Sequence, residues 1–309
     1  MKRQAGIALA ILVPLAAAAL LGWQLTKPAA PALARGTVCQ ARCHYVGAAF
    51  TFMSQDPLSA FEQVTGLKPG IVESYQAFGQ PFPSSWAGTL LTRGILPLIQ
   101  LQPRRVALGA IVAGRYDRYL SQYAAAVRAL GAPVGLSFGH EMNGSWYSWG
   151  YRHVPPGVFV AAWRHIHQVF AAHGARQVIW VWAVVRNTPG DSRVDSVRPW
   201  WPGGAYVDWV GLDIYYVSPE VTFRTAFVPT ITAVRSFTHD PILLTETAVP
   251  NQSGQVQQIA DLFAGARASH LLGIIWYDEN VLHTWQLDKS RPTAIAAFRR
   301  GAAGMLAPG

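Results

Sequence analysis

Cysteine is scarce in this chain of 309 residues, which contains only Cys39 and Cys43. A disulfide between them would close a very small loop and would stabilise little outside that turn. A zinc site is disfavoured, because two cysteines and His44 fall short of four ligands. Whether the two cysteines pair is left open. A chain of this length can bury a large core of its own, so its fold needs neither a disulfide nor a zinc site for stability.

Charged residues are also few, at 13% of the chain, whereas hydrophobic residues make up 51%. This balance excludes an intrinsically disordered protein. The net charge is +9, but the basic residues are scattered and form no run longer than two. A nucleic-acid-binding protein would gather them on one face. We therefore expect no nucleic-acid partner.

The N-terminus has the pattern of a targeting segment. Lys2 and Arg3 precede a stretch from Ala5 to Leu25 that is apolar apart from Gln24, about long enough to cross a bilayer. A cleaved signal would give a secreted protein, and an uncleaved anchor would attach it to the membrane through residues 5–25. In both cases the domain is exported. We assign residues 1–26 to this segment and residues 27–44 to a linker.

Eight short, β-rich apolar runs alternate with longer stretches of helical spacing. The runs are residues 45–52, 71–75, 95–102, 133–141, 177–184, 207–215, 241–248 and 271–279. Helical spacing is clearest in residues 116–130, 157–173 and 252–269, where apolar residues recur on one helix face.

This alternation predicts one α/β domain, a (β/α)₈ TIM barrel over residues 45–300, with a C-terminal tail over residues 301–309. The alternative is an open doubly wound sheet. Such a sheet usually carries a glycine-rich phosphate turn, and the chain has neither a G-x-G-x-x-G nor a Walker motif.

Acidic residues stand at the ends of predicted strands, where the chemistry of such a barrel takes place. Strand four ends in His140-Glu141, strand six in Asp213-Ile-Tyr215 and strand seven in Thr245-Glu246-Thr247. A single acid there could cap a helix or pair with an arginine. Two glutamates facing each other instead suit glycoside hydrolysis, in which one carboxyl donates a proton and the other attacks the anomeric carbon.

Tryptophan is abundant, with 12 residues. Indole rings offer a flat apolar partner for the C–H face of a sugar. Five tryptophans lie at or just past strand ends and are expected to contact sugar: Trp146, Trp149, Trp182, Trp276 and Trp285. Trp163 lies on a helix stripe and is expected to pack in the core.

These motifs resemble glycoside hydrolase family 26, retaining β-glycanases of the clan A barrels. HEMNGSWYSWG, WVWAVVRN, YVDWVGLDIY, LLTETA and WYDEN carry the resemblance, which runs from about residue 45 to residue 298. It implies that Glu141 is the general acid/base, that Glu246 is the nucleophile, and that Tyr215 steadies Glu246. It also implies that His140 helps to set the geometry of Glu141 and contacts sugar hydroxyls.

The same resemblance implies that Trp146 and Trp276 line the subsite where the bond is cut. Hydrolysis by two carboxyls requires no cofactor or metal, and we expect none. Further candidates for substrate binding are Gln102, Asn143, Trp149, Asn187, Asp213, Asp278 and Asn280. Asp213, which lies between Leu212 and Ile214, has a structural role as its alternative.

One departure from the family concerns the end of strand three. Mannan-cleaving members often carry Trp-His-Pro there, whereas this chain reads Gln100-Leu-Gln102-Pro103. The difference favours β-glucan, including mixed-linkage chains, over mannan or xylan. We therefore expect an exported, monomeric retaining endo-β-glycanase whose partner is a polysaccharide. The alternative is a non-hydrolytic glycan-binding or polysaccharide-export-associated protein on the same barrel. The sequence leaves endo or exo action open.

Overall fold

The computed structural model describes residues 44–54, 56–187, 190–280 and 284–307. The predicted targeting segment, nearly all of the linker and both cysteines fall within residues 1–43, outside the described ranges. Within those ranges, no helix is both long enough and apolar enough to span a membrane.

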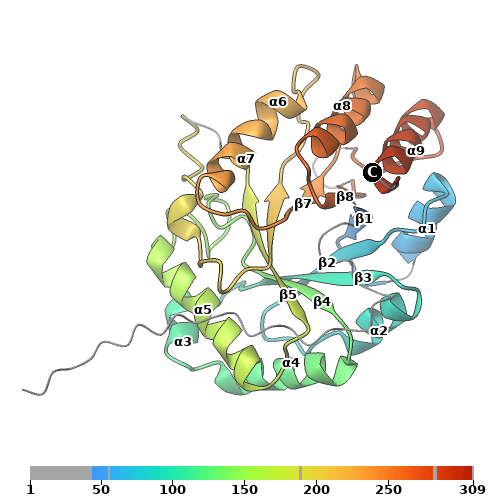
Figure 1. The fold of residues 1–309 in the computed structure, drawn as a ribbon. Helices are drawn as coiled ribbons and strands as arrows, with labels where there is room; N and C mark the ends of the chain where they lie inside the picture. The colour runs from blue at the N-terminus through green and yellow to red at the C-terminus, as the bar shows by residue number, and fades with distance from the viewer. Residues whose placement is uncertain (1–43, 55, 188–189, 281–283, 308–309) are drawn as a thin grey trace, which may run out of the picture.

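Eight parallel strands close into a barrel in the order of the sequence, with β1 paired to both β2 and β8. The strands are β1 Tyr45–Phe50, β2 Ile71–Ala77, β3 Leu96–Gln102, β4 Val134–Phe138, β5 Val178–Val185, β6 Trp209–Asp213, β7 Ile242–Thr247 and β8 Gly273–Tyr277. Each lies within or closely overlaps one of the predicted runs. Figure 1 shows the helices arranged around the strands, so the predicted (β/α)₈ barrel is confirmed.

The helices follow the strands and cover the outside of the barrel (Figure 1). They are α1 Asp56–Thr65, α2 Ser84–Thr92, α3 Leu108–Val112, α4 Asp117–Leu130, α5 Pro156–Ala172, α6 Phe223–Ala226, α7 Val228–Arg235, α8 Gln255–Ala268 and α9 Pro292–Leu306, with a 3₁₀ turn η1 at Arg198–Trp200. The three helices expected from their spacing, α4, α5 and α8, are all present.

Helix α5 shows how the apolar stripe fixes the packing. Its residues Phe159, Trp163, Ile166 and Phe170 are all buried, as the spacing predicts. Each such side chain contributes about 1.5–3 kcal/mol to the free energy of unfolding by leaving water. The stripe therefore holds α5 against the barrel and places the loop that precedes it beside the carboxyl end of β4.

Strand side chains alternate between the barrel interior and the helix layer, and this alternation corrects two predictions. In β8, Ile275 packs inside the barrel, whereas Trp276 is fully buried in the outer layer with its ring 5.3 Å from that of Phe298 on α9. In β5, Trp182 likewise packs against Trp201 and Phe237. Neither ring lies at the barrel mouth, so the expected sugar contacts of Trp276 and Trp182 are wrong.

The C-terminal boundary also differs from the prediction. Residues 301–309 were expected to form a tail, but α9 continues to Leu306. Phe298, Ala302 and Met305 are buried and recur at helical spacing. The apolar stripe of α9 thus extends past residue 300, and the helix extends with it.

Candidate active site

The chain turns sharply directly after β4. This strand ends at Phe138, so His140 and Glu141 lie in the following turn and not in the strand. Gly139 and Glu141 have φ values of 58° and 54°, in the left-handed region. Such a conformation costs a non-glycine residue about 1–3 kcal/mol and occurs where surrounding contacts hold it. Here the backbone N–H of Glu141 donates to the carbonyl of Ala183 at the end of β5, over 2.9 Å.

Glu141 is buried at the barrel mouth, and its environment favours the protonated form. Burial, followed by the negative charges of Glu246 and Asp213, raises the pKa of Glu141 to about 8. The indole N–H of Trp146 donates to Oε2 over 2.5 Å and partly opposes this shift. A carboxyl that keeps its proton at neutral pH can act as a general acid.

Glu246, on β7, is ionised although it is equally buried. Burial alone would raise the pKa of Glu246. The hydrogen bond and charge of His140, together with hydrogen bonds from the hydroxyls of Tyr215 and Tyr75, outweigh burial and lower the pKa. The hydroxyl of Tyr215 donates to Oε2 over 2.6 Å. Tyr215 is therefore placed as the sequence predicts, beside the proposed nucleophile.

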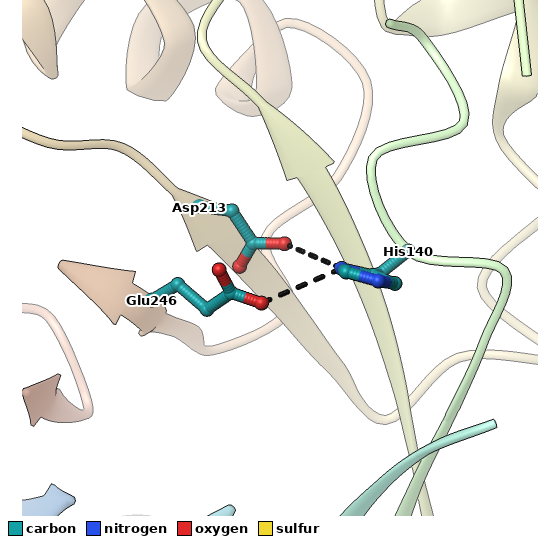
Figure 2. A group of neighbouring side chains, drawn as sticks. All are labelled: His140, Asp213 and Glu246. Carbon is teal, nitrogen blue, oxygen red and sulfur yellow. Dashed lines mark ion pairs between the residues drawn. The ribbon is translucent and has the colours of Figure 1, made fainter. Parts of the chain in front are cut away.

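His140 connects the two acids of β6 and β7. Its Nδ1 lies 3.4 Å from Oε1 of Glu246 and 3.5 Å from Oδ2 of Asp213. Figure 2 draws these two ion pairs as dashed lines. Burial lowers the pKa of His140, but its hydrogen bonds to Asp213 and Glu246 prevail and raise it well above its ordinary range. His140 was expected to set the geometry of Glu141. The contacts of its ring instead position Glu246, and its contact with sugar hydroxyls stays a prediction.

The buried Asp213 has the structural role that its position in the strand suggested as an alternative. Its Oδ1 accepts a hydrogen bond from the hydroxyl of Thr245, over 2.5 Å. Burial and the charge of Glu246 raise its pKa to about 7. Asp213 thus supports the ring of His140 from inside the barrel.

The described ranges contain one group of histidine and acidic side chains that could bind a common metal ion. It consists of His140, Asp213 and Glu246, each with one ligand atom within 4.8 Å of the others. A proton on Nδ1 of His140 accounts for the same spacing. Hydrolysis by two carboxyls requires no metal. The expectation that the site works without one therefore stays a prediction.

Trp146 is the tryptophan best placed for a sugar. Its side chain is 46% exposed while its N–H is held by Glu141. Trp149, by contrast, is buried, stacks on Tyr147 with ring centroids 4.3 Å apart, and donates its N–H to the carbonyl of His140. Trp149 therefore supports the turn that carries His140 and does not present its face to substrate, which corrects its assignment.

Tyr277 and Trp285 occupy the place that was predicted for Trp276. Trp285 stacks on Tyr215 with ring centroids 4.6 Å apart, and Tyr277 packs edge-on against Tyr215 and Tyr75. These rings line the β8 side of the site. Tyr277 was missed, although alternation along a strand puts it on the opposite face from Trp276.

Two of the further candidates hold loops and do not face substrate. The side chain of Asn143 is fully buried and brackets Val185, donating to its carbonyl and accepting from its N–H at 3.1 and 3.0 Å. The buried Asp278 accepts from the N–H of Leu287 over 2.7 Å. The amide of Asn143 and Oδ1 of Asp278 are thus engaged with backbone, which argues against the substrate contacts predicted for these two residues.

The remaining candidates lie at or just past the ends of β3, β5 and β8. Gln102 at the end of β3 has its Nε2 3.1 Å from Nε2 of His140. Asn187 is half-buried after β5, and its backbone N–H donates to Thr230. Asn280 pairs with Gln286 in the loop after β8. For Asn187 and Asn280, substrate binding stays a prediction.

One acid of the site escaped the sequence reasoning. Glu73, on β2, is fully buried inside the barrel, where Nε2 of Gln100 donates to its Oε1 over 3.2 Å. Burial and the charges of Glu246 and Asp213 raise its pKa well above the ordinary range. The signal was a lone acid at an inward position of an apolar strand.

A parallel barrel that carries one protonated and one ionised carboxyl at its mouth has the arrangement of a glycoside hydrolase. Comparison with known proteins agrees, since the sequence model described as "Glycosyl hydrolase family 26" matches residues 111–266. The chain belongs to this family.

Its relatives include both glucan- and mannan-named proteins. Endoglucanase H of Acetivibrio thermocellus is 29% identical over 264 residues, covering 80% of this chain and 29% of that protein. Mannan endo-1,4-beta-mannosidase of Bacillus subtilis is 29% identical over 131 residues, covering 39% of this chain and 34% of that protein. The chain thus spans about a third or less of the length of these curated relatives.

Solved structures show the same fold. An endo-beta-1,4-mannanase double mutant of Cellulomonas fimi superposes with a TM-score of 0.67 at 17% identity, covering 84% of this chain and 70% of that one. A beta-mannanase of Bacteroides ovatus gives a TM-score of 0.64 at 14% identity, covering 85% and 89%.

Proposed function

We propose that this protein is a retaining endo-β-glycanase that hydrolyses a β-linked polysaccharide. The observation that carries the proposal is the opposite direction of two pKa shifts in one buried network. Burial and neighbouring acids raise the pKa of Glu141 to about 8, whereas His140, Tyr215 and Tyr75 lower that of Glu246 despite its burial. In the described part of the chain, neither carboxyl is paired with an arginine.

The two states fit a double displacement. The Glu246 carboxylate attacks the anomeric carbon while Glu141 gives its proton to the glycosidic oxygen, so that the C–O bond breaks and a glycosyl ester forms. Glu141, now ionised, takes a proton from water as that water attacks the same carbon. The ester bond breaks, the sugar leaves with its original configuration, and both carboxyls regain their starting states.

The preferred polymer is β-glucan in this proposal, with mannan as the competing substrate. Strand β3 supplies the reason, because Gln102 stands where mannan-cleaving members often carry other residues and directly contacts His140. Relatives named for endoglucanase and for mannosidase activity both match the chain. The substrate panel below decides between the two polymers.

The proposal is tested with the full chain on mixed-linkage β-glucan, carboxymethyl cellulose, mannan and xylan, with new reducing ends and loss of viscosity as readouts. We expect cleavage of β-glucan, early loss of viscosity, and a first product in the β configuration by proton NMR. Glu246→Gln and Glu141→Gln should lose activity, whereas Glu62→Gln on the outer helix α1 should keep it.

Each contrary outcome has a distinct meaning. A first product in the α configuration would show inversion and contradict the double displacement. Faster cleavage of mannan would reverse the substrate preference. Binding without new reducing ends on every polymer would overturn the hydrolase and favour a glycan-binding protein.

A further inference from the structure

Tyr147 presents an unpaired hydroxyl at the barrel mouth. The residue is half-buried in the loop after β4, where its ring stacks on Trp149 and lies 5.1 Å from the ring of His140. Within the described part of the chain, its hydroxyl has no hydrogen-bond partner and is not enclosed by protein. The two ring contacts therefore hold the side chain in place and leave its hydroxyl available to a ligand.

The charges around this hydroxyl show that it lies in the catalytic site. Burial raises the pKa of Tyr147, and so do the negative charges of Glu141 and Glu246. The positive charge of Arg104 acts in the opposite direction. The hydroxyl is thus within electrostatic range of both carboxyls of the catalytic pair and of one guanidinium.

Arg104 approaches the same place from β3. It lies two residues past the end of that strand, it is exposed, and its Nε donates to Oε1 of Gln102 over 2.7 Å. The amide of Gln102 lies in turn 3.1 Å from Nε2 of His140. This contact holds one edge of the guanidinium beside the site. The two terminal nitrogens of Arg104 have no protein partner among the described residues, and both can donate to a ligand.

The two loops that carry these residues have an excess of positive charge. The loops after β3 and β4 contain Arg104, Arg105 and Arg152, all exposed, and their only acid is Glu141. The raised pKa of Glu141, about 8, keeps that carboxyl protonated at neutral pH. Within the described ranges, none of the three arginines forms an ion pair with an acid. This side of the barrel mouth therefore attracts negative charge.

We propose that Arg104 and Tyr147 form a subsite beside Glu141 that binds an acidic group of the glycan, a carboxylate carried by the polymer. Both side chains can donate hydrogen bonds, and the guanidinium can only donate. A carboxylate only accepts, and its two oxygens match the planar fork of an arginine. A sugar hydroxyl would leave the positive charge of this side unopposed. The subsite rests on the function proposed above for the class of polymer, and it makes an acidic β-glucan the substrate.

The direct test measures binding without cleavage. Glu141→Gln replaces a protonated carboxyl by its neutral isostere and should bind polymer without cutting it. Affinity electrophoresis of this full-length variant in carboxymethyl cellulose and in hydroxyethyl cellulose compares one backbone with and without carboxylates. We expect carboxymethyl cellulose to bind about tenfold more tightly at low ionic strength, and we expect added salt to reduce the difference.

Further substitutions in the Glu141→Gln chain locate the binding. Arg104→Ala should weaken the binding of carboxymethyl cellulose about tenfold and leave that of hydroxyethyl cellulose unchanged, because hydrogen bonds to a charged group are lost. Tyr147→Phe keeps the stacking on Trp149 and should weaken it about threefold, as expected for one hydrogen bond. Arg105→Ala is the matched control. It removes the same charge from the neighbouring exposed residue and should change binding less than about twofold.

Kinetics of the catalytically intact chain separate a substrate contact from a structural role. Arg104→Ala should raise KM for carboxymethyl cellulose with kcat little changed, and should leave both constants for hydroxyethyl cellulose at their wild-type values. If Arg104 served only to hold Gln102, its loss would disturb His140 and slow the cleavage of both polymers alike.

The outcomes distinguish the subsite from the proposed function. Equal binding of the two polymers by Glu141→Gln, or no binding of either, would overturn the subsite. An equal loss in Arg104→Ala and Arg105→Ala would also overturn it, since net charge alone would then account for the attraction. Cleavage of β-glucan with any of these results would leave the proposed function standing. Binding of carboxymethyl cellulose that depends on Arg104, in a chain that cleaves no polymer, would keep the subsite and remove the proposed function.

Discussion

Tyr215 and His140 hold Glu246 from two sides. The hydroxyl of Tyr215 donates to Oε2 over 2.6 Å, and Nδ1 of His140 lies 3.4 Å from Oε1. Because β6 and β7 are neighbours in the barrel and Asp213 pairs with Glu246 in register, Tyr215 reaches the carboxylate from just beyond the end of β6. The carboxylate plane is thus fixed before substrate arrives, which reduces the reorganisation needed for attack.

Removing one of these contacts should slow the chemical step. Tyr215→Phe keeps the stacking on Trp285 but loses the hydroxyl. A hydrogen bond to a charged group contributes about 1.5–3 kcal/mol, so kcat should fall about tenfold to hundredfold with KM less affected. Initial rates measure both. Tyr216→Phe is the matched control, since that hydroxyl donates to Asp261 and should not affect the rate. Wild-type kcat in Tyr215→Phe would show that Glu246 is held without it.

Trp146 should set the alkaline limit of activity. Glu141 must be protonated to act as an acid, so kcat/KM should fall as pH rises through its pKa of about 8. The indole N–H of Trp146 stabilises the ionised form and lowers that pKa. Trp146→Phe should therefore move the alkaline limb of the kcat/KM profile to higher pH. If the indole ring also contacts sugar, KM should rise as well. A limb that moved to lower pH would mean that the indole does not favour the carboxylate.

The sequence was sufficient for the barrel because each element carries its own signal. Apolar runs mark the strands, and stripes such as that of Phe159 and Trp163 mark the helices. Glu141 and Glu246 stand out as acids at the ends of apolar strands, whereas the role of Tyr215 followed from the family resemblance. These signals are local, so no knowledge of contacts was required to read them.

The errors in placing side chains arose where pairing with neighbouring strands decides which face a residue occupies and which residues it contacts. Which residues of β8 face inward depends on its pairing with β1 and β7, and the pairing with β7 shifts between Leu244 and Thr247. Pairing with β1 is regular from Gly273 to Tyr277, but the sequence does not show which of its residues face inward, and Trp276 was placed on the wrong face. Likewise, Glu73 meets Gln100 only through the register of β2 with β3.

Glu73 should be replaceable by its neutral isostere. Burial and the nearby acids raise its pKa, so it carries a proton at neutral pH. Glu73→Gln keeps an oxygen that can accept the hydrogen bond from the NH₂ of Gln100. Because this hydrogen bond is kept, kcat and KM should stay within about twofold of the wild type. Glu73→Ala should instead lower the melting temperature, because Gln100 loses its acceptor and a cavity opens. A hundredfold loss of kcat in a folded Glu73→Gln variant would show that the charged form takes part in catalysis.

Asp278 should make the protein less stable as pH rises, because its carboxyl is buried. Burial raises its pKa from 3.8 to about 7. Between these two values the folded protein keeps the proton that the unfolded chain releases, so the free energy of unfolding falls as pH rises through this window. Asp278→Asn keeps an acceptor for the N–H of Leu287 and has no proton to lose.

The Asp278→Asn variant should therefore melt above the wild type at pH 8, by about 2–4 °C for each kcal/mol recovered. Thermal unfolding at several pH values measures the difference, which should be more than halved at pH 5 and should close below about pH 4, where both the folded and the unfolded carboxyl are protonated. The exposed Asp288 is the control, because hydrogen bonds from Ser290 lower its pKa and Asp288→Asn should bring no gain at pH 8. Since Asp278 anchors the loop after β8 and does not face the site, KM should not change. A lower melting temperature for Asp278→Asn at pH 8 would mean that the loop needs an ionised carboxylate there.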